Sequence, residues 1–168
     1  MTFRRATPAD VESIITLVQA RIEWMDACGL HQWNETDYFG RYPRQYWADN
    51  IPHFLVGEAE GRVVVAICLY DDDVRWSQGE LRPGFELGTG RAYYLHHLVA
   101  DPACSGAGAD MMRYVEQHAA ACGVHCLRLD SAVGNTRLEQ FYTALGYVPC
   151  GLCHDRLYHG VLRQKLLK

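Results

Sequence analysis

The stretch LVADPACSGAGA, residues 98–109, decides the fold. An apolar strand is expected to stop at Pro102, after which the chain turns and glycine-punctuated residues open a helix. The first turn of a helix leaves N–H groups without intrahelical partners, and glycine lets a backbone approach an anion closely. Gly106 and Gly108 therefore predict a site for a phosphate or pyrophosphate. Taken alone, the two glycines are equally compatible with tight packing between strand and helix.

The residues on either side of this stretch predict a mixed α/β chain. Apolar side chains recur at helical spacing in one long N-terminal segment, and shorter apolar runs bounded by turn residues indicate strands. We expect strands at 2–6, 53–58, 62–70, 91–100, 124–130, 147–151 and 156–166, and helices at 9–28, 44–49, 106–122 and 135–145. Residues 71–90 are polar and are expected to form a loop or an extended hairpin.

The order strand, helix, strand over residues 91–130 predicts parallel pairing through a right-handed crossover. The flanking hairpins predict antiparallel neighbours, so we expect a mixed sheet. With 168 residues, no internal repeat and no low-complexity linker, a single domain over residues 1–168 is expected.

Charge and hydropathy exclude several function classes. The formal net charge is -4, and no basic run supports nucleic-acid binding. The longest apolar stretch, residues 63–69, is too short to span a bilayer, and no export signal is recognisable near residue 1. We therefore expect no membrane partner and a cytoplasmic location.

Seven cysteines are present, an odd number that cannot pair completely within one chain. We expect reduced, mostly structural thiols and no bound metal. A zinc site is an alternative by ligand type, although the spacing matches no recognised finger or ribbon. Its candidate ligands are Cys122, Cys126, Cys150, Cys153 and His154. The spacing of residues 150–154 also matches a haem-attachment motif, which normally implies export.

Two motifs about 30 residues apart resemble those of the GCN5-related N-acetyltransferase (GNAT) superfamily. Gly106 and Gly108 match the glycines of its acyl-CoA-binding pattern, Gln/Arg-x-x-Gly-x-Gly/Ala. Residues 135–147, NTRLEQFYTALGY, match the run that begins with Asn, continues as a helix bearing Tyr, and ends in Leu-Gly-Phe/Tyr. One departure is Ala103, which stands where the family has Gln or Arg. The loss of that charge-assisted contact is expected to weaken cofactor binding about ten- to a hundredfold.

The resemblance implies an α/β fold with a mixed, splayed seven-stranded sheet flanked by about four helices. It also implies acetyl-CoA as the cofactor, with pyrophosphate on the main-chain N–H groups of the loop and pantetheine along the preceding strand. The cofactor-binding residues implied are Leu98, Val99, Ala100, Cys104, Ser105, Gly106, Ala107, Gly108, Ala109, Asn135 and Tyr142. Asn135 is also a natural helix N-cap, and both roles are compatible.

The resemblance places Tyr142 at the family's general-acid position, where a phenol assists departure of the CoA thiolate. The alternative is a core aromatic. For the base we favour His96, which strand alternation puts on the face of Leu98, our candidate oxyanion donor. His97 is the second candidate. Cys104 is a poor nucleophile candidate because no acid–base partner is identifiable near it.

The expected activity is transfer of acetyl from acetyl-CoA to a primary amine of a small molecule, a peptide N-terminus or a lysine, by direct attack in a ternary complex. The alternatives are a non-catalytic acyl-CoA-binding or sensor module, an acyltransferase with a longer donor, and a metal-binding protein. Aromatic and acidic side chains would suit a cationic or aryl-bearing amine. They are Trp24, Trp33, Tyr38, Trp47 and Asp71, Asp72 and Asp73. The aromatics are equally compatible with core packing or contacts in a homodimer.

Overall fold

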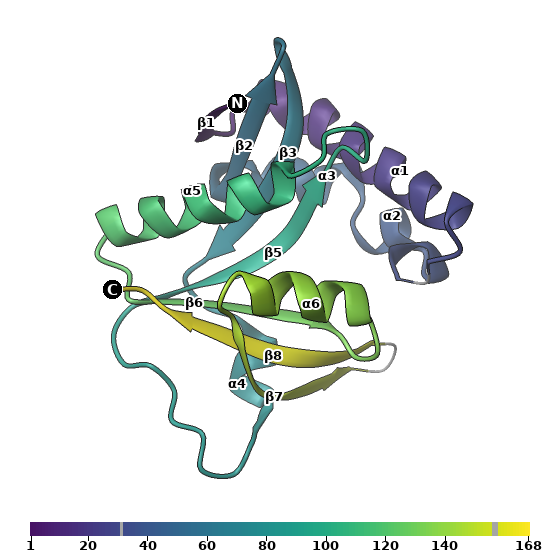
Figure 1. Ribbon diagram of the computed structural model, residues 1–168. Helices are drawn as coiled ribbons and strands as arrows, with labels where there is room; N and C mark the ends of the chain where they lie inside the picture. Colours follow the sequence, from purple (N-terminus) through teal and green to yellow (C-terminus); the bar gives the residue numbers. More distant parts are fainter. Residues whose placement is uncertain (31, 156–157) are drawn as a thin grey trace. The chain divides into compact units, whose positions relative to one another are not determined.

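A computed structural model describes residues 1–30, 32–155 and 158–168 (Figure 1). Over these ranges the chain forms six α-helices and eight strands. The strands belong to one sheet in the order β1-β2-β3-β5-β6-β8-β7-β4. No helix of the described chain is both long and apolar enough to cross a lipid bilayer.

The chain divides into two compact units. The first unit is Met1–Leu69 with His97–Tyr114, and the second unit is Tyr70–His96 with Val115–Lys168. Strand β5 and helix α5 each begin in one unit and end in the other. This division describes which residues pack together and does not test the number of domains. A single domain over residues 1–168 therefore stays a prediction.

The first unit is built on an antiparallel β1-β2-β3 sheet. Helix α1 begins where Thr7 and Asp10 form a capping box, whose carboxylate also pairs with Arg4. This pairing, together with the hydrogen bonds from Thr7, lowers the pKa of Asp10 to about 2. The elements introduced in this unit are β1 (Thr2–Arg5), α1 (Val11–Ala27), α2 (Tyr38–Arg41), α3 (Arg44–Asn50), β2 (Phe54–Ala59) and β3 (Arg62–Tyr70).

The second unit is a mixed sheet. Its pairing of β5 with β6 is parallel, and β6 with β8, β8 with β7 and β7 with β4 are antiparallel, which confirms the predicted mixed pairing. The remaining elements are α4 (Val74–Gln78), β4 (Glu80–Leu81), β5 (Ala92–Ala100), α5 (Ala107–Ala121), β6 (Cys126–Ala132), α6 (Thr136–Ala144), β7 (Val148–Asp155) and β8 (Tyr158–Leu166).

Helices cover both faces of the second unit's sheet, as neighbouring residues of β8 show. Leu162 packs with Trp76 of α4, whereas Arg163 donates to Ser131 of β6 and lies 3.8 Å from Glu139 of α6. Successive strand residues point to opposite faces. Helices α4 and α6 therefore lie on opposite faces, and α6 packs on β6 (Figure 1).

The predicted numbers of elements need correction: the described chain has eight strands rather than seven, and six helices rather than about four. Helices α2 and α4 lie in segments expected to be irregular, and β4 is the additional strand. A helix of four or five residues completes too few turns to show hydrophobic periodicity. Each is marked instead by an N-cap aspartate, Asp37 or Asp73, whose side chain accepts a backbone N–H bond. The predicted start of the last strand, residue 156, lies outside the described residues.

Candidate active site

The loop between β5 and α5, in the first unit, is held in a defined turn by Asp101. The Asp101 carboxylate accepts from the Ala103 N–H at 2.9 Å and pairs with Arg62 at 2.5 Å. The Cys104 N–H donates to the Asp101 carbonyl, also at 2.9 Å. The bond from Arg62 and that from the Ala103 backbone hold the pKa of Asp101 below its usual value. The loop is therefore anchored by a group that remains ionised at neutral pH.

The turn leaves several amides available at the start of α5. The N–H groups of Cys104 and Ala107 are already engaged by backbone carbonyls. Across the described chain, no backbone acceptor is found for the N–H groups of Ser105 and Gly106 in the loop or of Gly108 and Ala109 in the first turn of α5. Gly106 has φ 85°, and a Cβ added there would meet nothing within 4 Å, so the surface beside it is open. These amides can hold an anion without rearrangement.

Strand β5 changes conformation within its length. Its described pairing with β6 covers Ala92–Leu95, and His97 then takes φ 52°, a left-handed conformation rare for a residue other than glycine. A left-handed residue in a strand is characteristic of a bulge. The regular alternation of side chains between the two faces of a strand is interrupted at such a residue. Alternation therefore no longer supports the prediction that His96 and Leu98 lie on the same face.

The backbone after His97 is engaged by residues of the first unit, among them Val64, whose carbonyl accepts from the Asp101 N–H at 2.8 Å. The Ala100 carbonyl accepts from Arg21 at 2.8 Å, so it is already engaged. Val99 and Ala100 are buried, and Leu98 is half-buried. Leu98 is therefore the most accessible of the three strand residues predicted to contact pantetheine.

His97 lies in an aromatic cage in the first unit. Its Nδ1 is 2.7 Å from the Tyr38 hydroxyl, and its Nε2 is 2.8 Å from the Tyr46 hydroxyl. Tyr42, Trp47 and Phe54 also contact the ring, and Trp47 is fully buried. Tyr38 and Trp47, two of the aromatics considered for an acceptor pocket, therefore pack in the core around His97.

His96, the adjacent residue, belongs to the second unit and has a different environment. Its Nε2 lies 2.5 Å from Oδ2 of Asp73, and Tyr70 packs against the ring. Burial would raise the pKa of Asp73, but the His96 hydrogen bond and charge and the Arg75 backbone N–H hold it below its usual value. An ionised carboxylate only accepts, so Nε2 carries a hydrogen in either form of the ring, and in the neutral form Nδ1 is the unprotonated nitrogen.

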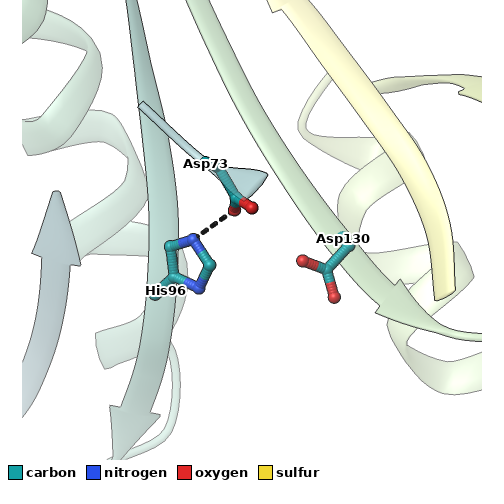
Figure 2. A group of neighbouring side chains, drawn as sticks. All are labelled: Asp73, His96 and Asp130. Atoms are coloured by element: carbon teal, nitrogen blue, oxygen red, sulfur yellow. Dashed lines mark hydrogen bonds and ion pairs between the residues drawn. The ribbon is translucent and has the colours of Figure 1, made fainter. Parts of the chain in front are cut away.

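Asp130 joins this pair from β6, as Figure 2 shows. One potential ligand atom from each of Asp73, His96 and Asp130 lies within 4.8 Å of the others. Among the described residues this is the only such group of three, and none of the cysteines considered for zinc belongs to one. Sequence reasoning named Asp73 only within an acidic run and missed Asp130. The available signal was that Asp130 is the last residue of the strand predicted over residues 124–130, beside a parallel neighbour.

The two predicted residues on and beside α6 also belong to the second unit. Asn135 caps the helix, its side chain accepting from the Leu138 N–H at 3.0 Å, which leaves its amide N–H₂ for other contacts. Tyr142 is buried against Phe141 and Tyr147. Burial, followed by the charge of Asp130, raises the pKa of Tyr142 well above its ordinary value. Tyr142 is therefore a neutral hydrogen-bond donor at physiological pH.

Comparisons with known proteins agree with this geometry. A model of the acetyltransferase (GNAT) family matches residues 17–147. Among solved structures, a GNAT acetyltransferase from Streptococcus agalactiae is 20% identical, with 99% of this chain and 95% of that chain covered and a TM-score of 0.79. A GNAT acetyltransferase from Listeria monocytogenes is 24% identical, with 99% and 94% covered and a TM-score of 0.71.

A third solved structure, a PaiA N-acetyltransferase from Thermoplasma acidophilum in complex with coenzyme A, is 17% identical. The match covers 98% of this chain and 98% of that chain, with a TM-score of 0.71. At these identities the solved structures show the shared fold. No curated protein matches the sequence. The family match spans most of the chain, and the chain belongs to the acetyltransferase (GNAT) family.

Proposed function

We propose that the protein transfers an acetyl group from acetyl-CoA to a primary amine, by direct attack within a ternary complex. Membership of an acetyltransferase family supports acyl transfer in general. The observation that carries the specific proposal is the His96–Asp73 pair, because it presents an oriented imidazole directly after the last paired residue of β5. An imidazole in this setting is suited to removing a proton at neutral pH.

The residues present fit coenzyme A. The N–H groups of Ser105, Gly106, Gly108 and Ala109 would hold the pyrophosphate, and the Asn135 amide would contact the pantetheine arm. Acetyl-CoA supplies an activated acetyl thioester. The Leu98 N–H is our candidate for donating to the thioester oxygen as negative charge develops there.

The proton transfers can be assigned to named atoms. An ammonium acceptor loses one proton to Nδ1 of His96, and its nitrogen lone pair then forms the C–N bond. The C–S bond breaks, and the sulfur takes up a second proton from that nitrogen, either directly or through Tyr142. The products are an N-substituted acetamide and CoA thiol, and His96 returns its proton to solvent.

His96 is a better base than His97 for a physical reason. Both ring nitrogens of His97 are hydrogen-bonded to phenols, so its use as a base would require breaking one of these bonds. His96 has one nitrogen oriented by a carboxylate, the arrangement that fixes a tautomer in known acid–base pairs. We therefore assign the proton transfer to His96.

The test is a thiol-release assay with acetyl-CoA and a panel of primary amines. We expect turnover by the wild-type protein and a loss in kcat on the order of a hundredfold or more in His96→Gln. CoA affinity measured by calorimetry should be unchanged. His125→Gln, at an exposed histidine, is the matched control and should behave as wild type. CoA binding without turnover on any amine would favour the non-catalytic sensor, and no binding at millimolar CoA would reject both.

A further inference from the structure

Asp130 occupies a defined position relative to His96. The last paired residues of β5 and β6 are Leu95 and Leu129, and His96 and Asp130 are the next residue on each strand. Equivalent residues of paired parallel strands face the same side of a sheet. Figure 2 accordingly shows the Asp130 carboxylate directed toward His96 and Asp73. Asp130 therefore lies across from the proposed base, at the point where the pairing ends.

Asp130 lies among other charged groups of the second unit. Its side chain is only 7% exposed, and among the described residues it forms an ion pair with Arg75, 3.7 Å away. Arg75 is shared with Asp155 at 3.5 Å, and Asp73 is also ionised. The Tyr158 hydroxyl hydrogen-bonds to Asp130 but carries no charge. Asp130 therefore shares its cation with a second carboxylate, and a positively charged group bound beside it would add a further favourable partner.

The spacing of the three side chains fits an ammonium group. A tetrahedral nitrogen that donates two hydrogen bonds of ordinary length bridges acceptors about 4.7 Å apart. One potential ligand atom of each of Asp73, His96 and Asp130 lies no more than 4.8 Å from the others, which permits such a bridge. A transition metal would need donors about 2.0–2.2 Å from a common point. Here His96 and Asp73 instead bond to each other, and a guanidinium lies beside Asp130.

We propose that Asp130, with Asp73 and His96, binds the acceptor in its ammonium form, and that this site selects basic aliphatic primary amines. The inference rests on the proposed acetyl transfer and adds the recognition step. Asp130 holds the ammonium against the basic Nδ1 of His96. One N–H proton passes to that nitrogen, which leaves a neutral amine with a free lone pair.

The experiment compares Asp130→Asn with wild type on two acceptors of similar size at pH 8: n-propylamine, which is cationic, and aminoacetonitrile, which is largely neutral. We expect kcat/KM for n-propylamine to fall on the order of 30-fold or more, because one partner of a buried ion pair is lost. The value for aminoacetonitrile should change by no more than about threefold. Asp155→Asn removes the other carboxylate paired with Arg75 and should leave the ratio of the two acceptors unchanged.

Each failure can be recognised. Wild-type protein that acetylates neither amine contradicts the proposed function itself. Wild-type turnover with equal losses on both amines in Asp130→Asn contradicts the ammonium site while leaving acetyl transfer intact. Calorimetric binding of Zn²⁺ or Mn²⁺ to wild type but not to Asp130→Asn would assign the three side chains to a metal instead. Thermal melting and CoA binding of each variant confirm that it is folded.

Discussion

Two neighbouring histidines illustrate how much one residue position changes chemistry. His97 has a strained left-handed backbone and phenols on both ring nitrogens, whereas His96 has a carboxylate on one nitrogen. A strained conformation persists only where its surroundings hold it in place, and the aromatic cage does so for His97. The contacts of His97 therefore favour a structural role at the change in β5, and His96 is the residue that we propose for acid–base chemistry.

Tyr142→Phe tests the proposed role of the phenol. Because a hydrogen bond to a charged group is worth about 1.5–3 kcal/mol, we expect kcat to fall roughly tenfold or more, with CoA affinity unchanged. Burial raises the pKa of Tyr142, so it stays protonated and should cause no loss of wild-type rate as the pH rises from 8 to 10. Steady-state kinetics against pH would check both statements.

Tyr147→Phe is the control for this substitution. Tyr147 packs against Tyr142, and its hydroxyl has no hydrogen-bond partner within the described residues. Removal of the Tyr147 hydroxyl should therefore leave kcat unchanged. An unchanged kcat in Tyr142→Phe, or equal losses in both variants, would remove the phenol from the mechanism.

At the scale of elements, the β5–loop–α5 segment combines a family feature with a departure from it. The loop is anchored by Asp101 and leaves exposed amides before the helix, as phosphate binding requires. Ala103 is exposed and contributes no side-chain donor. The backbone can hold a pyrophosphate, but the charged contact of the family pattern is missing. This element is therefore expected to bind CoA more weakly than one that retains it.

Ala103→Arg should restore that contact. We expect the Kd for CoA, measured by calorimetry at low salt, to fall about tenfold, because a charge-assisted hydrogen bond to phosphate contributes roughly 1.5–3 kcal/mol. Ala120→Arg adds the same charge at an exposed position near the other end of α5 and should change the Kd little. An equal gain in both variants would indicate non-specific attraction, and no gain in Ala103→Arg would place the pyrophosphate elsewhere.

At the scale of the molecule, the seven cysteines are all free, and four of them are buried: Cys68, Cys126, Cys150 and Cys153. Cys150 and Cys153 pack with Trp76 and Leu162 in the core of the second unit. Burial raises the pKa of Cys150 to about 11 and that of Cys153 to about 12. These thiols act as small apolar side chains and are poor nucleophiles in the folded protein.

Thiol titration of the native protein at pH 8 should therefore show one fast-reacting group, exposed Cys28, slower reaction of half-buried Cys104 and Cys122, and reaction of the four buried thiols only on unfolding. The thiolate fraction of Cys150 and Cys153 is expected to be roughly 10⁻³ or less at that pH. Cys28→Ser should remove the fast phase. Rapid labelling of Cys150 or Cys153, located by mass spectrometry, would contradict this packing.

Sequence reasoning identified the features that depend on local order along the chain. Strand β5, the glycine loop and α5 were predicted with ends within one residue of those observed, and Asn135 was recognised as a helix cap. Such features follow from nearest-neighbour physics: a helix needs a cap and a repeating apolar face, and a turn needs glycine at positive φ. Mixed pairing followed from the order of elements.

Tertiary structure alone decided what depends on residues far apart in the chain. Where β5 stops pairing with β6 determines that His96 and Asp130 face each other, and Asp73 arrives from a separate segment. The phenols that occupy both nitrogens of His97 come from α2 and α3, more than 50 residues away. The choice between the two histidines was therefore open in the sequence, because the identity of a base depends on its hydrogen-bond partners and not on its position in a motif.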